Sequence, residues 1–170
     1  MTGPRRQQKP FMIGLSAGAL RALALAIAVT LPAVRGQAAT TEWIVVDQLS
    51  GLAIAGYDPV AYFTEGSATT GRDDLEYEYA GASWRFRNEG NRAAFIADPQ
   101  VFMPQFGGYD PVDIARGAPL AGDPRLWMLR GERLYLFYTD EARARFASDS
   151  ERILIAAERR WPSLKKTLTP

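Results

Sequence analysis

Carboxylates, thioethers and aromatic rings are the side chains that could carry chemistry in this sequence, because its 170 residues include neither cysteine nor histidine. This composition excludes a disulfide framework, a zinc finger, a haem held by His or Cys, a cysteine nucleophile and a Ser-His-Asp triad. Oxygen ligation of a hard cation, acid and base chemistry of carboxylates, and binding by aromatic surfaces remain.

Three aspartates stand where short helices are predicted to begin: Asp58 at one start, and Asp110 with Asp113 at another. Such oxygen donors could hold a divalent cation, which makes Asp110 and Asp113 the candidate metal ligands. Aspartate at a helix start also caps free N–H groups and complements the helix dipole. Capping is the favoured interpretation, because Ca²⁺ needs six to eight oxygens and the sequence has no dedicated loop for it.

Two weaker signals have ordinary structural explanations. The acidic residues within 73–78 have the residue type of a glycosidase pair, but charges along a strand are typical of a solvated face. Met103 and Met128 offer thioethers to Cu(I), yet methionines beside aromatic rings usually fill a core.

Aromatic residues next to glycines are the better candidates for a binding site. Glycine lets the backbone approach a ligand closely, and rings lining a small pocket suit an apolar or cationic ligand. The interpretation that these rings simply build the core is still favoured. The candidate ligand-binding residues are Tyr57, Asp58, Tyr62, Phe106, Gly107, Gly108, Tyr109 and Asp110.

Short elements must position these residues. The pattern predicts strands over residues 43–46 and 52–54, then a helix over 58–66 with an Asp-Pro start and a glycine exit. Alternating apolar residues predict a β-hairpin over 75–86, and a helix capped by Asn88 follows as far as Ala97.

The second part of the chain is predicted to contain a helix over 110–117, a β-hairpin over 126–138, and two C-terminal helices over 140–147 and 150–160. Strands and helices mix without a regular βαβ rhythm, so the predicted class is α+β in a single small domain. The sequence Gly-Tyr-Asp-Pro-Val occurs at 56–60 and again at 108–112. Because the flanks do not match, two uses of one helix-start device are favoured over a duplication.

Four segments, at residues 56–63, 79–99, 103–110 and 127–138, together resemble the bacterial exported proteins of the YHS-domain group. Residues 79–110 are the most specific, with an aromatic strand, an Asn-Arg helix, Asp-Pro and then Pro-Gln-Phe-Gly-Gly-Tyr. The resemblance implies a small α+β domain related to modules beside copper-transporting ATPases and some oxygenases, for which metal binding has been proposed.

The chemical residues of that group are replaced here. Its members typically place cysteine or selenocysteine after Gly-Gly-Tyr, where this chain has Asp110. The wider pattern also has a cysteine where Arg87 and Asn88 stand, and a histidine. Because a thiolate is a soft ligand and a carboxylate a hard one, the exchange changes which metals could bind.

Residues 1–38 are laid out as a signal peptide, with basic residues near the start, an apolar stretch over 22–34 and small residues before a predicted cleavage after Ala38. Arg21 interrupts any span long enough to cross a bilayer, so an uncleaved anchor is the less favoured alternative. The rest of the chain has 15 basic against 19 acidic side chains, a balance that does not favour nucleic-acid binding.

The sequence therefore predicts an exported protein, periplasmic or secreted, with a YHS-like domain over residues 39–170. Its expected function is a non-catalytic binding or interaction module for an unknown protein or small molecule, without a cofactor. Membrane contact is expected only if the N-terminal segment is retained. The alternative is an enzyme or metal-binding protein that uses a divalent metal ion on Asp110 and Asp113.

Overall fold

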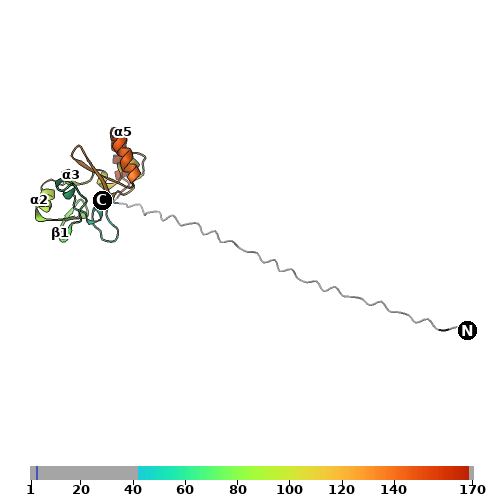
Figure 1. The fold of residues 1–170 in the computed structure, drawn as a ribbon, viewed down its shortest axis with the longest axis horizontal. Helices are drawn as coiled ribbons and strands as arrows, with labels where there is room; N and C mark the ends of the chain where they lie inside the picture. The colour runs from blue at the N-terminus through green and yellow to red at the C-terminus, as the bar shows by residue number, and fades with distance from the viewer. Residues whose placement is uncertain (1–2, 4–41, 169–170) are drawn as a thin grey trace. The chain divides into compact units, whose positions relative to one another are not determined.

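The computed structural model of the chain describes residue 3 and residues 42–168 (Figure 1). The predicted signal peptide and its cleavage point fall outside the described residues, apart from Gly3. In the described part of the chain, no helix combines the length and apolarity needed to span a membrane.

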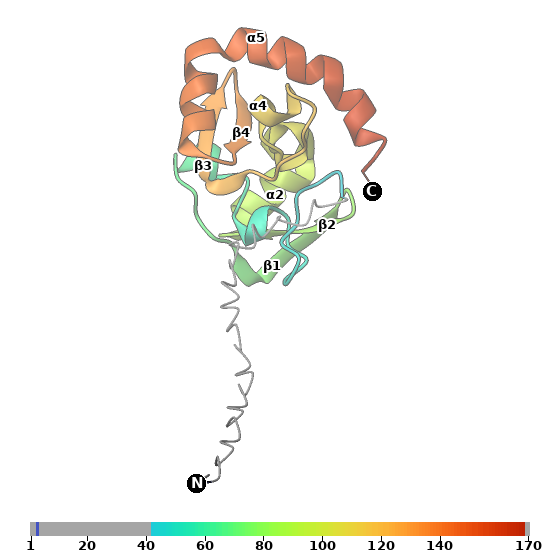
Figure 2. The same ribbon diagram turned by 90° about the vertical axis from the view of Figure 1, so that its right-hand side faces the viewer.

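The described residues form an α+β fold with two separate two-stranded antiparallel sheets, so the predicted class is confirmed (Figures 1 and 2). The first half contains the 3₁₀ turn η1 (Ile54–Gly56), α1 (Ala61–Thr64), β1 (Arg72–Tyr79), β2 (Ala82–Phe86), α2 (Glu89–Ala97) and α3 (Pro99–Phe102). The second half contains the 3₁₀ turn η2 (Gln105–Gly108), α4 (Pro111–Ile114), β3 (Asp123–Arg130), β4 (Arg133–Phe137) and α5 (Asp140–Lys165).

The two strands predicted before the first helix are wrong. Residues 43–46 and 52–54 form only isolated bridges, Val46 with Ala53 and Leu52 with Ser83. Ile54 and Ala55 have φ angles of 43° and 54°, so the backbone turns left-handed where a strand was expected to continue. The following helix is also shorter than predicted and covers only Ala61–Thr64.

The two predicted C-terminal helices are both present, but they are consecutive segments of one long helix, α5. Asp149 has φ −149° and ψ 47°, which interrupts the helix between the two predicted segments. Figure 2 shows α5 curving over the second hairpin. Its second segment continues beyond the predicted end at 160 and includes Pro162 before it stops at Lys165.

The two halves repeat the same order of elements, each with a 3₁₀ turn, a short helix, a hairpin and a capped helix. The hairpins share one irregularity of register, between Arg72 and Glu76 in β1 and between Asp123 and Trp127 in β3. Equivalent hydrogen bonds are Asp58 N–H to Thr69 O (2.8 Å) and Asp110 N–H to Leu120 O (2.9 Å), and Gly71 N–H to Gly56 O (2.9 Å) and Gly122 N–H to Gly108 O (3.0 Å).

The recurring Gly-Tyr-Asp-Pro-Val is therefore one part of a structural repeat, and the interpretation as two uses of a local device is wrong. The two flanks match in backbone conformation more than in sequence. Residues 54–56 and 106–108 all have positive φ, although only three of these six positions are glycine. Comparing the flanks by residue identity misses this agreement of the main chain.

Each half has its own aromatic core, arranged around one fully buried phenylalanine. Phe95 lies 5.1 Å from Trp84 and 5.2 Å from Phe86, measured between ring centroids. The second core repeats this arrangement, with Phe146 at 5.0 Å from Tyr135 and 5.2 Å from Phe137. In both halves the hairpin thus packs its second strand on the helix that follows it.

Residues 43–46 connect the two halves, and we refer to them as the strap. The Val45 N–H donates to the Gly107 carbonyl at 2.8 Å, while the Val45 carbonyl accepts from the Ile54 N–H at 2.9 Å. Ile44 packs in the first core and Val45 in the second. The strap therefore joins η1 to η2 by main chain and both cores by side chain.

Candidate functional site

Asp58 and Asp110 occupy equivalent, fully buried positions in the two halves. The Asp58 carboxyl group holds the turn that leads into α1 by accepting from the Val60 N–H at 2.8 Å and the Ala61 N–H at 3.3 Å. Its second oxygen accepts from the Arg87 N–H at 2.8 Å and from the Asn91 side-chain amide at 2.6 Å. Asp58 thus ties the short helix to the end of β2 and to the first turn of α2.

Asp110 makes the same main-chain connections without the amide. It accepts from the Val112 N–H and from the Tyr138 N–H, both at 2.7 Å. Burial raises the pKa of Asp110 to about 6, against the opposing effect of these N–H donors, and the nearby Asp113 adds to the rise. The capping predicted from the sequence is therefore present at Asp110, whereas Asp58 holds the turn before α1, whose N-cap is Val60.

Asp113, the other candidate metal ligand, lies in the first turn of α4 and pairs with Arg116 at 3.2 Å. The described residues contain no group of three or more His, Cys, Asp or Glu side chains that could hold a metal ion. Both oxygens of Asp110 already accept main-chain hydrogen bonds. The geometry around these two carboxylates is that of helix capping and an ion pair.

The tyrosines of the predicted site are separated by the fold. Tyr62 is fully buried in the first core, where its hydroxyl donates to the Pro124 carbonyl at 2.9 Å and burial raises its pKa. Tyr109 is fully buried in the second core and donates to the Glu42 carbonyl. Tyr57 is partly exposed and bridges Thr70.

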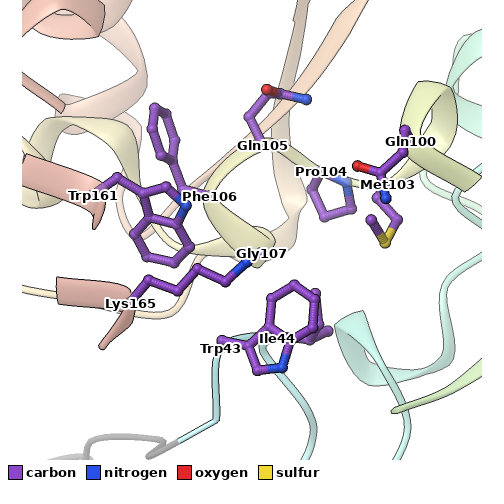
Figure 3. A pocket seen from close by; sticks show the side chains of 10 residues that line it. All are labelled: Trp43, Ile44, Gln100, Met103, Pro104, Gln105, Phe106, Gly107, Trp161 and Lys165. Carbon is purple, nitrogen blue, oxygen red and sulfur yellow. The ribbon is translucent and has the colours of Figure 1, made fainter. Parts of the chain in front are cut away.

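A cavity of about 170 Å³ lies beside η2, and two of the predicted residues, Phe106 and Gly107, line it (Figure 3). The neighbouring Gly108 is buried under Val45 and is not part of the lining. The lining residues come from the strap, α3, η2 and the end of α5. The cavity therefore lies where the two halves meet.

Two tryptophans form part of the wall of the cavity. Trp43 comes from the strap and Trp161 from α5 (Figure 3). The Trp161 ring stands edge-on to Phe106, with 5.8 Å between centroids and 83° between planes, and this contact fixes its position. Ile44, Met103 and Pro104 complete the apolar part of the lining.

The polar part of the lining consists of one cation and two amides, from Lys165, Gln100 and Gln105. The Lys165 ammonium lies 3.9 Å from the centroid of the Trp43 ring, which is a cation–π contact. Figure 3 shows its side chain reaching from α5 toward Gly107. Among the described lining residues there is no carboxylate, so Lys165 supplies their only formal charge.

Sequence reasoning missed the residues that complete this cavity. Trp161 lies one residue beyond the predicted end of the C-terminal helix, and Trp43 was expected only in a strand. Met103, interpreted as core filler, is buried and also lines the cavity. Only the strap's path between η1 and η2 brings Trp43 to Trp161, and nothing in the local pattern signals that path.

The remaining candidates lie elsewhere. Glu76 forms an ion pair with Arg85 across the first hairpin at 2.7 Å, as expected for a solvent-exposed strand face. Met128 packs against the second core and is partly buried. Neither residue contacts the cavity lining.

Comparisons of this chain with protein-family models, with curated proteins and with solved structures find no match. The chemistry of the cavity is therefore assigned from the residues that line it.

Proposed function

We propose that the chain is an exported, YHS-like binding module that takes a small organic ligand into the cavity between Trp43 and Trp161, without catalysing a reaction. The observation that carries this proposal is the cavity itself, about 170 Å³ and lined by two indoles at the junction of the halves. Small-molecule sites are usually concave and combine apolar side chains with a few polar groups, and this lining contains both kinds.

The volume limits the size of the ligand. A cavity of about 150 Å³ is large enough for benzene, while sites for drug-sized ligands start at about 300 Å³. The space beside η2 therefore suits a single ring with a small substituent. Larger ligands would need the rim residues, Gln100 and Lys165, to move outward.

The lining favours binding over catalysis. Acid and base catalysis needs a titratable group close to the reacting atoms, and the described lining has only Lys165, an exposed side chain already stacked on Trp43. The alternative, a hard-metal protein using Asp110 and Asp113, has less support because Val112, Tyr138 and Arg116 already engage these carboxylates.

Export and the family assignment belong to the same proposal. Their support is the layout of residues 1–38 and the four matching segments of sequence. The intact mass of the protein recovered from the exporting cell tests the first: cleavage after Ala38 removes the signal, and a full-length mass contradicts it.

Nuclear magnetic resonance of the indole N–H groups tests the binding proposal, because the four tryptophans report from different places. Trp43 and Trp161 line the cavity, whereas Trp84 and Trp127 belong to or pack on the first core. In a screen of single-ring compounds, we expect saturable shifts at the first two indoles and little change at the others.

A pair of variants gives the matched control. Trp43→Leu should weaken binding of the best compound at least about tenfold, since it removes one wall of the cavity. Trp127→Leu, which also removes a partly buried indole, should leave the affinity unchanged. The proposal fails if no compound shifts Trp43 and Trp161, or if both variants behave alike.

A further inference from the structure

We infer that the cavity beside η2 selects a small ring compound bearing an anionic group, such as a monocyclic aromatic carboxylate. This inference rests on the proposed function and adds the charge of the ligand. Two observations support the inference: the charge of the described lining residues is positive, and the charged group, the Lys165 ammonium, lies beside the indoles.

Charge complementarity is the first step. Lys165 is the only formally charged residue in the described lining, and no carboxylate there balances it. A carboxylate next to an ammonium gains a charge-assisted hydrogen bond, whereas an amine in the same place is repelled. The lining therefore discriminates between ligands by charge as well as by size.

The stacking of Lys165 explains why a cationic ligand, which the aromatic residues alone would suit, fits poorly. The Trp43 face that would attract such a ligand already holds the Lys165 ammonium, 3.9 Å from the ring centroid. That contact also keeps the ammonium beside the cavity instead of in bulk solvent. A bound anion would thus meet a cation whose position is already restricted.

The apolar lining supplies the second half of the recognition. Met103, Pro104 and Phe106 are buried residues, and with Trp161 they surround space of about the volume of one substituted ring. A ring placed there would remove apolar surface from water while its anionic group stays at the exposed end near Lys165. Small anions without a ring, such as acetate, would lose this contribution.

The test uses three probes of nearly equal size: benzoate, benzyl alcohol and benzylamine. Each is titrated at pH 7 into the wild-type protein, with the indole signals of Trp43 and Trp161 as the readout. We expect benzoate to bind about tenfold more tightly than benzyl alcohol and benzylamine to bind most weakly.

Two lysine variants separate a local effect from a general one. Lys165→Gln should lower the affinity for benzoate about tenfold and leave benzyl alcohol unchanged. Lys166→Gln, the adjacent exposed lysine outside the lining, should change neither. Because both side chains are exposed, neither substitution is expected to unfold the protein.

The outcomes distinguish this inference from the proposed function. Equal binding of the three probes at Trp43 and Trp161, or equal effects of the two lysine variants, would overturn the anionic preference while leaving a binding cavity. Failure of all three probes to shift either indole overturns both. Benzoate binding that responds to Lys165→Gln alone supports both.

Discussion

The two halves of this protein share one main-chain frame but differ in what surrounds their central aspartate. Asp58 accepts hydrogen bonds from the main-chain N–H groups of Val60, Ala61 and Arg87 and from the Asn91 amide. Asp110 has main-chain donors equivalent to Val60 and Arg87, namely Val112 and Tyr138, and the residue that corresponds to Asn91 is Ala142. The same backbone connection thus forms with or without a side-chain donor.

A second difference lies in the turn before each aspartate. The first half has Ala55 where the second has Gly107, and a Cβ at Gly107 would lie 1.9 Å from the Trp43 carbonyl oxygen. The second half therefore accepts the strap against its turn, and that packing places Trp43 in the cavity wall. The repeat is a common scaffold, and the glycine at position 107 lets the turn of the second half lie against the strap residue that forms part of the cavity wall.

The largest expected effect concerns the cores. Trp84→Ala removes a fully buried indole packed on Phe95 and should lower the free energy of unfolding by about 3 to 5 kcal/mol. The equivalent change, Tyr135→Ala, should cost less, about 2 to 4 kcal/mol, because Tyr135 is smaller and 6% exposed. Urea unfolding of both variants measures the comparison. An unchanged midpoint for Trp84→Ala would mean that the strand faces are misassigned.

Removing each central carboxyl group should sharpen the contrast between the halves. Asp58→Ala leaves the Arg87 N–H, the Val60 N–H and the Asn91 amide without their acceptor, and we expect a loss of about 3 kcal/mol or more. Asp110→Ala should lower the free energy of unfolding by about 2 kcal/mol. The loss is smaller because fewer donors are left without an acceptor, and because burial disfavours the charged form of the carboxyl group that is removed. Thermal unfolding checks the order, and a larger loss at Asp110 would contradict it.

The turn glycine gives a test with a matched control. Gly107→Ala forces a Cβ against the Trp43 carbonyl and should destabilise the fold by about 2 kcal/mol, while also weakening ligand binding in the cavity. Ala55→Gly, the reciprocal change in the other half, should alter stability by less than about 1 kcal/mol. Calorimetric melting compares them, and similar melting temperatures would show that the strap does not depend on this contact.

The raised pKa of Asp110 predicts a pH dependence. Its folded-state value of about 6 exceeds the ordinary value of about 3.9, so between these pH values the folded state binds more protons than the unfolded state. This contribution to stability is fully present below about pH 4 and is lost as the pH rises through 6.

Asp110→Asn removes this titration and leaves the other carboxyl groups in place. The free energy of unfolding of the wild type, relative to that of the variant, should therefore fall by about 2 kcal/mol from pH 4 to pH 7. Urea titrations at four pH values measure it. A difference that does not vary with pH would place the folded-state pKa of Asp110 near its ordinary value.

Local sequence signals predicted the fold well where short-range rules determine the backbone conformation. Asn88 caps α2, the hairpins follow the alternation of apolar residues, and Asp110 caps α4, all as expected from short-range rules. The left-handed turns were missed at Ile54 and Phe106, because bulky residues rarely adopt positive φ and their sequence argues for extended backbone.

The site was predicted only in part, for a different reason. Phe106 and Gly107 were found because glycine-rich aromatic segments are typical of close approach. Trp43 and Trp161 lie at opposite ends of the described domain, and only tertiary packing brings them to one cavity. Single-chain patterns do not encode such long-range neighbours, and the repeat that organises them is visible chiefly in the main chain.

The strap also has a mechanical consequence. Tension applied to the N-terminal side of residue 42 would reach the two hydrogen bonds of Val45 before it reached any strand of either hairpin. Because one of those bonds holds η1 and the other η2, their rupture would detach the strap from both halves. The Tyr62–Pro124 hydrogen bond and the packing of Leu134 and Leu136 in the first core would still hold the halves to each other. An anchor point upstream would thus load the bonds of Glu42 and Val45 before it loaded either hairpin.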